Sequence, residues 1–162
     1  SYLYQGEELG LPEHTTIAPE FRQDPTFFRT AGKRVGRDGC RVPLPWEPSG
    51  GSNGFNTTGQ SWLPQPESYK DLARSNQEHL EGSTLSMYQQ ALEVRKALKL
   101  GEGSFDWVSL ESDLTYENGQ VLVIHNFGTE PVLLPEGHVL VSSMPPAAGG
   151  YLLPNDTAWI LP

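Results

Sequence analysis

The sequence has little of what several large classes of protein require. It holds one cysteine, Cys40, so a disulfide within the chain is excluded, and this low cysteine content favours a reducing cytoplasm. No run approaches the roughly 18 apolar residues of a membrane-spanning helix. Basic residues are also scarce, with 11 Lys and Arg against 20 Asp and Glu and a formal net charge of −9. Such a charge repels phosphate backbones and anionic lipids, so we expect neither a nucleic acid nor a membrane as partner.

The chain is also short, and its first residues lack the marks of a secretory signal. Its 162 residues fall below the roughly 250 that a complete (β/α)8 barrel needs. Residues Ser1–Tyr4 carry no initiator Met, no basic start and no long apolar region. Their aromatic and Leu side chains run directly into the polar Gln5–Glu8, which predicts a buried strand that ends in a loop and has no preceding strand to pair with. We therefore expect the chain to be a piece of a longer protein.

No motif for metal, phosphate or nucleophile chemistry stands out. The histidines are widely separated: His14, His79, His125 and His138. Cys40 has no His or Cys at ligand spacing, so we expect no metal and no cofactor. Three glycines lie in a basic stretch without the strand-to-helix context of a phosphate loop: Gly32, Gly36 and Gly39. The Gly-x-Ser-x-Gly pattern of a serine nucleophile is missing.

The segment from Gly10 to about Pro66 is rich in Gly, Pro, Asn and Thr and shows no sustained period. Loops of this length in compact domains are usually functional or disordered. Six aromatic residues lie in it: Phe21, Phe27, Phe28, Trp46, Phe55 and Trp62. Because aromatic residues are scarce in disordered chains, we predict an ordered excursion whose aromatic side chains pack on other parts of the protein.

Two helices are predicted after this segment. Ser83–Leu100 has an apolar stripe at helical spacing, formed by Leu85, Tyr88, Ala91, Leu92, Arg95 and Leu98. Ser83 is a suitable N-cap, and Gly101 a suitable residue to end the helix. A shorter helix is predicted between Glu67 and Glu78, with three residues facing inward: Tyr69, Leu72 and Ala73.

Beyond Gly103 the pattern changes to short strands, which predicts an antiparallel sheet or sandwich. The expected strands are Phe105–Leu110, Leu114–Glu117, Gln120–Asn126, Pro131–Leu134, Val139–Ser142 and Ala158–Leu161. Asn118-Gly119 predicts a hairpin with a type I′ turn, because both residues tolerate a positive φ.

Four cations lie close together between Gly32 and Trp46 in this otherwise acidic chain. The planar fork of an arginine can bind a carboxylate or sugar hydroxyls, and Trp46 offers a flat face on which a sugar ring could stack. Alternatively, these arginines pair only with Asp38 and neighbouring Glu residues. The carboxylates of Glu7 and Glu8 are expected to be solvated charges, and at most one of the two could face a site.

Several stretches together resemble the α-glucosidases of the α-amylase family, the group that includes oligo-1,6-glucosidase. Residues 2–11 read YLYQGEELGL and residues 36–46 read GRDGCRVPLPW, followed by Gly54-Phe55 and Trp62-Leu63-Pro64. Their order and spacing match those of the family over essentially the whole chain. Each short motif is weak alone, and their co-linear occurrence is specific.

The resemblance implies an α+β fold: the last β/α unit of a (β/α)8 barrel, followed by an antiparallel, β-sandwich-like domain. Tyr2–Gln5 would be the eighth strand, the excursion to about Trp62 the substrate-side loop, and Ser83–Leu100 the closing helix. The barrel part would cover residues 1–101 and the β domain residues 102–162. In the isolated chain, residues 1–66 would be disordered, rearranged or engaged with another copy, which makes self-association a further expectation.

The resemblance also implies retaining hydrolysis of terminal α-linked glucose from an oligosaccharide substrate by two carboxyls about 5 Å apart. The family's nucleophilic Asp, acid/base Glu and additional Asp lie on earlier strands, so no residue of this chain is assigned a catalytic role, and the chain alone should be inactive. Arg41 is the first candidate to contact the terminal glucose, paired with an Asp near the start of the whole enzyme. Arg37 is the second candidate, and Asp38 would orient either one.

Two other functions stay open. The chain could be a non-catalytic carbohydrate-binding β module whose sugar platforms are Trp46, Trp62, Trp107 and Trp159. It could also be part of a trehalose synthase of the same family, an isomerase that shares much of this region. The linkage of the substrate depends on loops that lie outside this chain.

Overall fold

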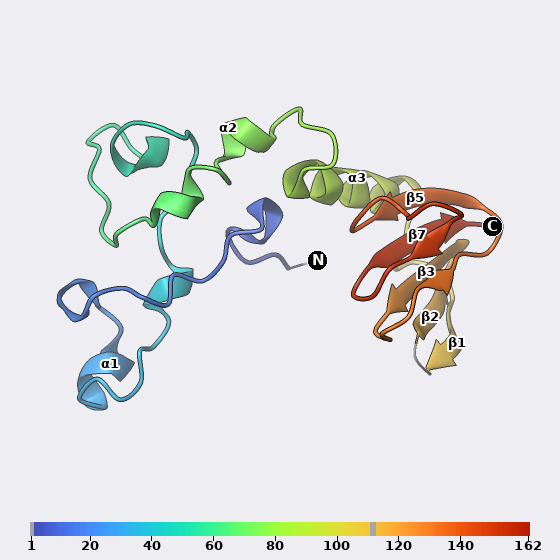
Figure 1. Ribbon diagram of the computed structural model, residues 1–162, viewed down its shortest axis with the longest axis horizontal. Helices are drawn as coiled ribbons and strands as arrows, with labels where there is room; N and C mark the ends of the chain where they lie inside the picture. Colours follow the sequence, from blue (N-terminus) through green and yellow to red (C-terminus); the bar gives the residue numbers. More distant parts are fainter. Residues whose placement is uncertain (1, 111–112) are drawn as a thin grey trace. The chain divides into compact units, whose positions relative to one another are not determined.

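The computed structural model describes residues 2–110 and 113–162 (Figure 1). The chain divides into two compact units, Ser1–Leu85 and Ser86–Pro162. The first is drawn in blue to green in Figure 1 and the second in yellow-green to red. The domain boundary expected between residues 101 and 102 stays a prediction.

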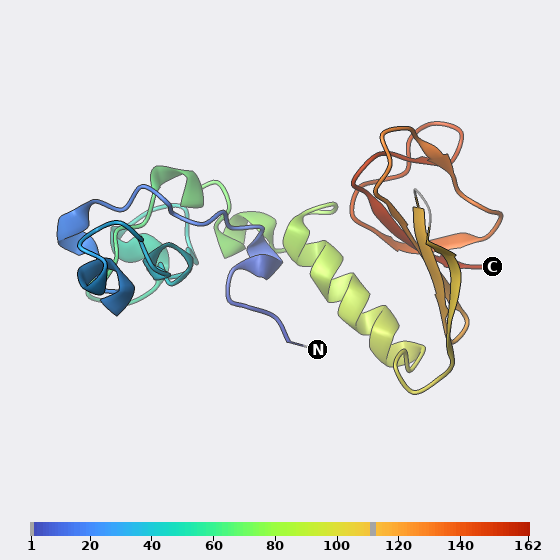
Figure 2. The same ribbon diagram turned by 90° about the horizontal axis from the view of Figure 1, so that it is seen from below.

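The first unit consists of turns and single helical turns, as expected for its Gly- and Pro-rich sequence (Figure 2). Its short 3-10 helices are Glu7–Leu9, Pro19–Phe21, Asp38–Cys40, Gly51–Gly54 and Glu67–Tyr69, and its α-helices are α1 (Pro25–Arg29) and α2 (Arg74–Gln77). The helix expected over Glu67–Glu78 is interrupted at Ala73, where ψ is 144°. A small apolar core of Ile17, Val42, Leu63 and Tyr69 holds these turns together.

The strand expected over Tyr2–Gln5 is absent. Residues 2–4 carry no regular structure and their side chains are exposed. A strand forms only when a neighbour completes its backbone hydrogen bonds, and neither sheet among the described residues includes this segment. The excursion itself is ordered, but five of its six aromatic residues are exposed: Phe21, Phe28, Trp46, Phe55 and Trp62. Two of them still have a packing partner: Phe28 meets Phe27 edge to face, and Arg74 lies over the ring of Trp46.

The long helix α3 spans Thr84–Ala97, slightly less than expected. The left-handed residue that follows the helix is Lys99, with φ of 52°, and not Gly101 as expected. The Leu100 N–H donates to the Arg95 carbonyl at 3.0 Å and the Lys99 N–H to the Lys96 carbonyl at 3.3 Å, which is the Schellman pattern. None of the helix side chains is fully buried, and most members of the apolar stripe are half-buried. Among the described residues, no helix has both the length and the apolar character that a membrane crossing requires.

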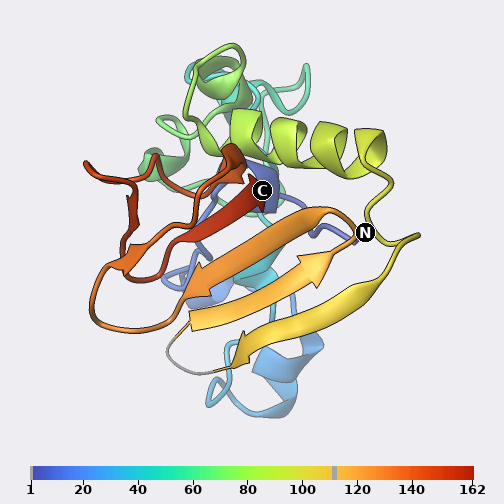
Figure 3. The same ribbon diagram turned by 90° about the vertical axis from the view of Figure 1, so that its right-hand side faces the viewer.

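The second unit contains an antiparallel sheet of five strands in the order β1-β2-β3-β7-β5 (Figure 3) and a small ladder of β4 with β6. The strands are β1 (Phe105–Leu110), β2 (Asp113–Asn118), β3 (Val121–Asn126), β4 (Val132–Leu133), β5 (His138–Ser142), β6 (Tyr151–Leu152) and β7 (Thr157–Leu161). All six expected strands are present. The two-residue β6 was not expected, because two residues are too few to show an alternating pattern.

The hairpin between β2 and β3 has a different turn from the one expected. Asn118 pairs with Val121, so the turn residues are Gly119 and Gln120. Of these two only Gly119 has a positive φ, at 60°, which matches a type II′ turn and not type I′.

Alternation along the strands gives the five-stranded sheet two apolar faces. Ile124, Ala158 and Ile160 pack with Leu152 of β6 on one face. Val121 and Val123 pack with Leu100 on the opposite face. Such two-sided burial is the reason why this unit forms a sheet with its own core.

Replacing Lys99 by Gly should stabilise the second unit. A side chain in the left-handed region is unfavourable, and glycine removes that penalty, so the free energy of unfolding should rise by about 0.5–1 kcal/mol. Urea unfolding of the 162-residue chain followed by circular dichroism measures the change. Lys96→Gly, the same substitution inside α3, should lower the stability by about 0.5–1 kcal/mol. Two shifts of the same sign would contradict the assignment of the helix end.

Candidate functional site

The candidate site in the first unit begins with Asp24, which lies directly before Pro25. An Asp that precedes a helical Pro is a typical helix start, and the Asp24 Oδ1 accepts a hydrogen bond from the Thr26 N–H at 2.8 Å as the N-cap of α1. The side chain is buried, with 7% of its surface exposed. Its second oxygen, Oδ2, points to the stretch that contains the predicted arginines.

Asp38 holds the backbone on which Asp24 lies. Its side chain is fully buried, and its Oδ2 accepts the N–H groups of Gln23 and Asp24 at 2.9 and 3.0 Å. Its other oxygen, Oδ1, has no hydrogen-bond partner among the described residues. No ion pair joins Asp38 to Arg37 or Arg41 within residues 2–110 and 113–162. The Asp38 carboxylate reaches the arginines through Asp24, and the Asp38 carbonyl accepts the Arg41 N–H at 2.9 Å.

Arg41 pairs with Asp24: its Nη1 lies 3.3 Å from Asp24 Oδ2, and 35% of the arginine side chain is exposed. The same oxygen accepts the backbone N–H of Arg37 at 3.0 Å. The Arg37 side chain is exposed and makes no ion pair within residues 2–110 and 113–162. The sequence allowed the arginines to pair with Asp38 or a neighbouring Glu. An ion pair within the loop is found, but its carboxylate is that of Asp24.

The environment of Asp24 favours its ionised form. Its pKa is lowered to about 2, first by the N–H of Thr26, then by the N–H of Arg37, and further by the Thr26 side chain and the charge of Arg41, against an opposing effect of burial. Asp24 is thus a permanent negative charge at ordinary pH. A charge held by backbone groups is a fixed partner for the flexible arginine side chain.

Glycines allow this close packing. A Cβ at Gly36 would lie 2.5 Å from the Asp24 Cγ, and Gly36 has a φ of 73°. A Cβ at Gly39 would lie 2.7 Å from the His14 carbonyl oxygen. The spacing of these glycines therefore reflects close approach of the backbone to other groups, and not a phosphate loop.

Sequence reasoning did not identify Asp24 as a site residue. The available signal was the Asp-Pro pair, which predicts a helix start but not what else the carboxylate binds.

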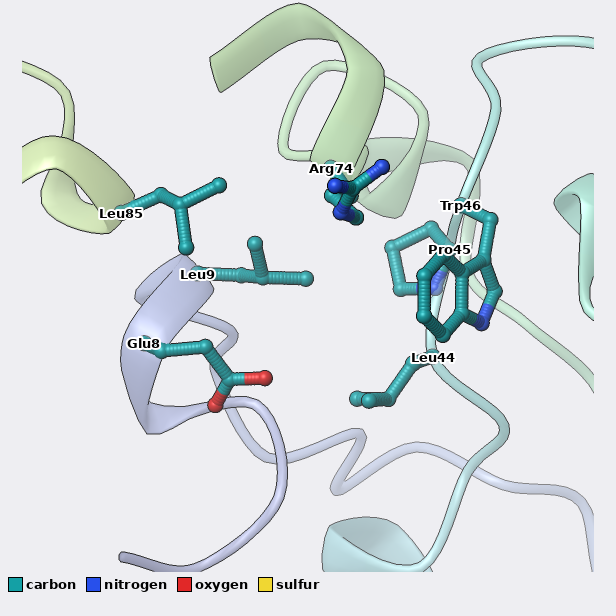
Figure 4. Close-up of a pocket in the computed structure, with 7 residues that line it drawn as sticks. All are labelled: Glu8, Leu9, Leu44, Pro45, Trp46, Arg74 and Leu85. Atoms are coloured by element: carbon teal, nitrogen blue, oxygen red, sulfur yellow. The ribbon is translucent and has the colours of Figure 1, made fainter. Parts of the chain in front are cut away.

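A second feature of this unit is a pocket of about 140 Å³ (Figure 4). Its lining residues are Glu8, Leu9, Leu44, Pro45, Trp46, Arg74 and Leu85. Glu8 is thus the member of the Glu7-Glu8 pair that faces this pocket, and its Oε2 accepts the Gly6 N–H at 2.9 Å. The Arg74 guanidinium lies 5.5 Å from the centre of the Trp46 ring, so it covers one face of the indole predicted as a sugar platform.

In the second unit, aromatic rings form a row across β1, β2 and β3, here called the aromatic row: Phe105, Trp107, Tyr116, His125 and Phe127. Neighbouring ring centres lie 4.9 to 5.9 Å apart. Trp107 is 55% exposed, whereas Trp159 packs against the core of Val121 and Val123. Burial lowers the pKa of His125, whose Nδ1 lies 2.7 Å from Thr157 Oγ1.

Comparison with known proteins gives one family match and several relatives. The family described as alpha amylase, catalytic domain, matches residues 1–103. The salivary alpha-glucosidase of Aedes aegypti is 35% identical over 81% of this chain and 24% of its own length. The probable alpha-glucosidase of Rhizobium meliloti is 33% identical over 88% of this chain and 28% of its own length. The chain thus spans about a quarter of the length of these curated relatives.

Solved structures give the same fold. An alpha-glucosyl transfer enzyme superposes with a TM-score of 0.75 at 32% identity, over 98% of this chain and 32% of its own. The trehalose-6-phosphate hydrolase of Bacillus licheniformis superposes with a TM-score of 0.73 at 22% identity, over 98% of this chain and 35% of its own. The predicted fold class is confirmed: α+β, the last part of a barrel followed by an antiparallel β domain.

Gly36→Ala should destabilise the first unit by about 2–4 kcal/mol, because the new methyl group collides with Asp24 in a backbone conformation that already disfavours a side chain. Gly32→Ala is the matched control: its φ of 80° is similar, but the nearest atom to a new Cβ is 3.6 Å away on Phe27. It should lose only about 1 kcal/mol. Urea unfolding of both variants measures the difference. Equal losses would show that Gly36 is needed for its φ alone and not for contact with Asp24.

Proposed function

This chain belongs to the α-amylase catalytic-domain family, and from that membership we propose that it is the carboxyl-terminal segment of a retaining α-glucosidase. The substrate class is oligosaccharides with a terminal α-linked glucose. Relatives that carry the name alpha-glucosidase, of which this chain spans about a quarter, support this assignment. The role of the segment is to supply one wall of the glucose-binding site.

The observation that carries the proposal is the pairing of Arg41 with Asp24. The pair uses Nη1, and about a third of the arginine side chain is exposed, so the remaining N–H groups are free to donate to sugar hydroxyls. A guanidinium that a buried carboxylate already orients loses less conformational freedom when a sugar binds. Hydrogen bonds from such a charged group are worth about 1.5–3 kcal/mol each.

Chemistry needs groups that this chain is not proposed to hold. Retaining hydrolysis uses a carboxylate nucleophile and a carboxylic acid on opposite sides of the scissile bond, about 5 Å apart. We assign both, and the further Asp, to the preceding strands of the whole enzyme. The 162-residue chain alone is then a binding wall without a catalytic pair, and it should not hydrolyse a nitrophenyl α-glucoside.

A graft tests the proposal. The chain replaces the matching part of the Rhizobium meliloti relative, and release of nitrophenol is measured. The graft should be active, the isolated chain inactive, and Arg41→Ala in the graft should lower kcat/KM by about 10- to 150-fold, the equivalent of one lost charged hydrogen bond. Arg34→Ala, which removes an exposed arginine from the same stretch, is the control and should change kcat/KM little.

A smaller graft of residues 1–66 provides a second test if the larger graft misfolds, because it leaves the host's own helix and β domain in place. Activity of the isolated chain, or two well-folded grafts without activity, would overturn the assignment. Equal losses from Arg41→Ala and Arg34→Ala would remove Arg41 from the binding site.

A second candidate function, a carbohydrate-binding β module, is favoured by the aromatic row. Its exposed rings, Phe105, Trp107 and Phe127, offer apolar surface of the kind on which sugar units stack. Trp107 is the exposed tryptophan of the row, whereas Trp159 belongs to the core and is dropped as a platform.

Titration of the full chain with maltose tests the module. Tryptophan fluorescence should change with saturation, and Trp107→Ala should abolish the change, because the ring would be the platform. Trp62→Ala removes an equally exposed indole from the first unit and should leave binding intact. Absence of saturable binding, or equal loss in both variants, would rule out a sugar-binding role for the aromatic row.

A further inference from the structure

We propose that Asp24 is a positioning residue that makes Arg41, and not Arg37, the glucose-binding arginine of this loop. The inference rests on the proposed function and deepens it: it names a carboxylate within this chain that orients the arginine, in addition to the Asp near the start of the whole enzyme that the resemblance implies. The family match does not assign Asp24 a role, and the sequence alone left both arginines as candidates.

Three hydrogen bonds hold Asp24 in place. One oxygen accepts the Thr26 N–H at 2.8 Å, and the other accepts the Arg37 N–H at 3.0 Å. Its own N–H donates to Asp38 at 3.0 Å. All three hydrogen bonds involve backbone groups, so the position of the carboxylate is set by the chain path and not by flexible side chains.

Asp24 contacts the two arginines in different ways. Arg37 binds Asp24 through its backbone N–H, and its side chain is exposed and makes no ion pair in the described part of the chain. Arg41 instead places its guanidinium 3.3 Å from Asp24 Oδ2. Of the two side chains only Arg41 is therefore restrained before a substrate arrives, and binding by a restrained side chain loses less entropy.

The two buried carboxylates, Asp38 and Asp24, are linked to each other. Asp38 binds the N–H groups of Gln23 and Asp24, and Asp24 binds Arg41, so the buried Asp38 is connected to the partly exposed guanidinium through one residue. Gly36 lets the backbone of the basic stretch lie against Asp24, as the 2.5 Å approach of its Cβ position shows. The basic stretch and the start of α1 thus pack together and fix the position of Arg41.

One test needs no catalysis. In the ¹⁵N-labelled 162-residue chain, the order parameter of the Arg41 Nε–H group should exceed that of Arg37. Asp24→Asn keeps a side chain that can cap α1 but removes the charge, and it should lower the Arg41 value to that of Arg37. Glu20→Gln, which neutralises an exposed carboxylate near Asp24 in sequence, is the control and should change neither value. Equal order parameters in the unmodified chain would overturn the inference without any variant.

The second test is a double-mutant cycle in the active graft. Asp24→Asn should raise KM about tenfold with kcat changed less than about twofold, because the glucose contact is made in both the ground and transition states. In the Arg41→Ala background, the same substitution should cause no further loss, since a positioning residue acts only through its target. Losses that add in full would show that Asp24 has a general structural role and would overturn the inference.

The two arms separate the inference from the proposed function. If Arg41→Ala leaves kcat/KM unchanged while Arg41 is ordered by Asp24, the ion pair is present and the proposed glucose contact is wrong. If Arg41→Ala lowers kcat/KM but Arg41 is no more ordered than Arg37, the glucose contact stands and positioning by Asp24 is wrong.

Discussion

Buried carboxylates that accept backbone N–H groups organise the first unit of this protein. A segment with neither a sheet nor a long helix leaves many of its backbone groups without regular partners, and these groups need other acceptors. Asp38 and Asp24 supply such acceptors for four N–H groups, and Asp24 stays ionised because these bonds and Arg41 lower its pKa to about 2. The arrangement of the arginines follows from this pair of carboxylates.

The second unit uses a different principle. Its backbone groups are satisfied by the ladder of antiparallel strands, and its stability comes from apolar side chains on both faces of the sheet. The aromatic row crosses β1 and β2 and reaches the end of β3, and its Trp107 is exposed. The two proposed sugar-binding functions therefore use two different types of surface, hydrogen-bond donors in the first unit and aromatic rings in the second.

In the proposed enzyme, the arginine that binds the sugar and the carboxyls that cleave the bond lie on different segments of the chain. An arginine fixed by a carboxylate can orient a sugar, but glycoside hydrolysis needs a pair of carboxyls at a set separation from each other. This division belongs to the proposed function, and it fits a chain that spans about a quarter of the length of its curated relatives. In that proposal the arginine wall is a specificity element, and other strands of the proposed enzyme supply the chemistry.

The sequence by itself determined the family, the long helix and six strands of the second unit. Those strands were located to within a residue or two, since short β-prone runs separated by turn residues show in the sequence, and the long helix was located by its spacing. What the tertiary structure decided were properties with no local trace. Asp24 is the partner of Arg41 because the start of α1 and the basic stretch meet at Gly36. Residues 2–4 form no strand because a strand depends on its neighbour. The chain leaves α3 at Lys99 because hydrogen bonds back to Arg95 and Lys96 set the helix end.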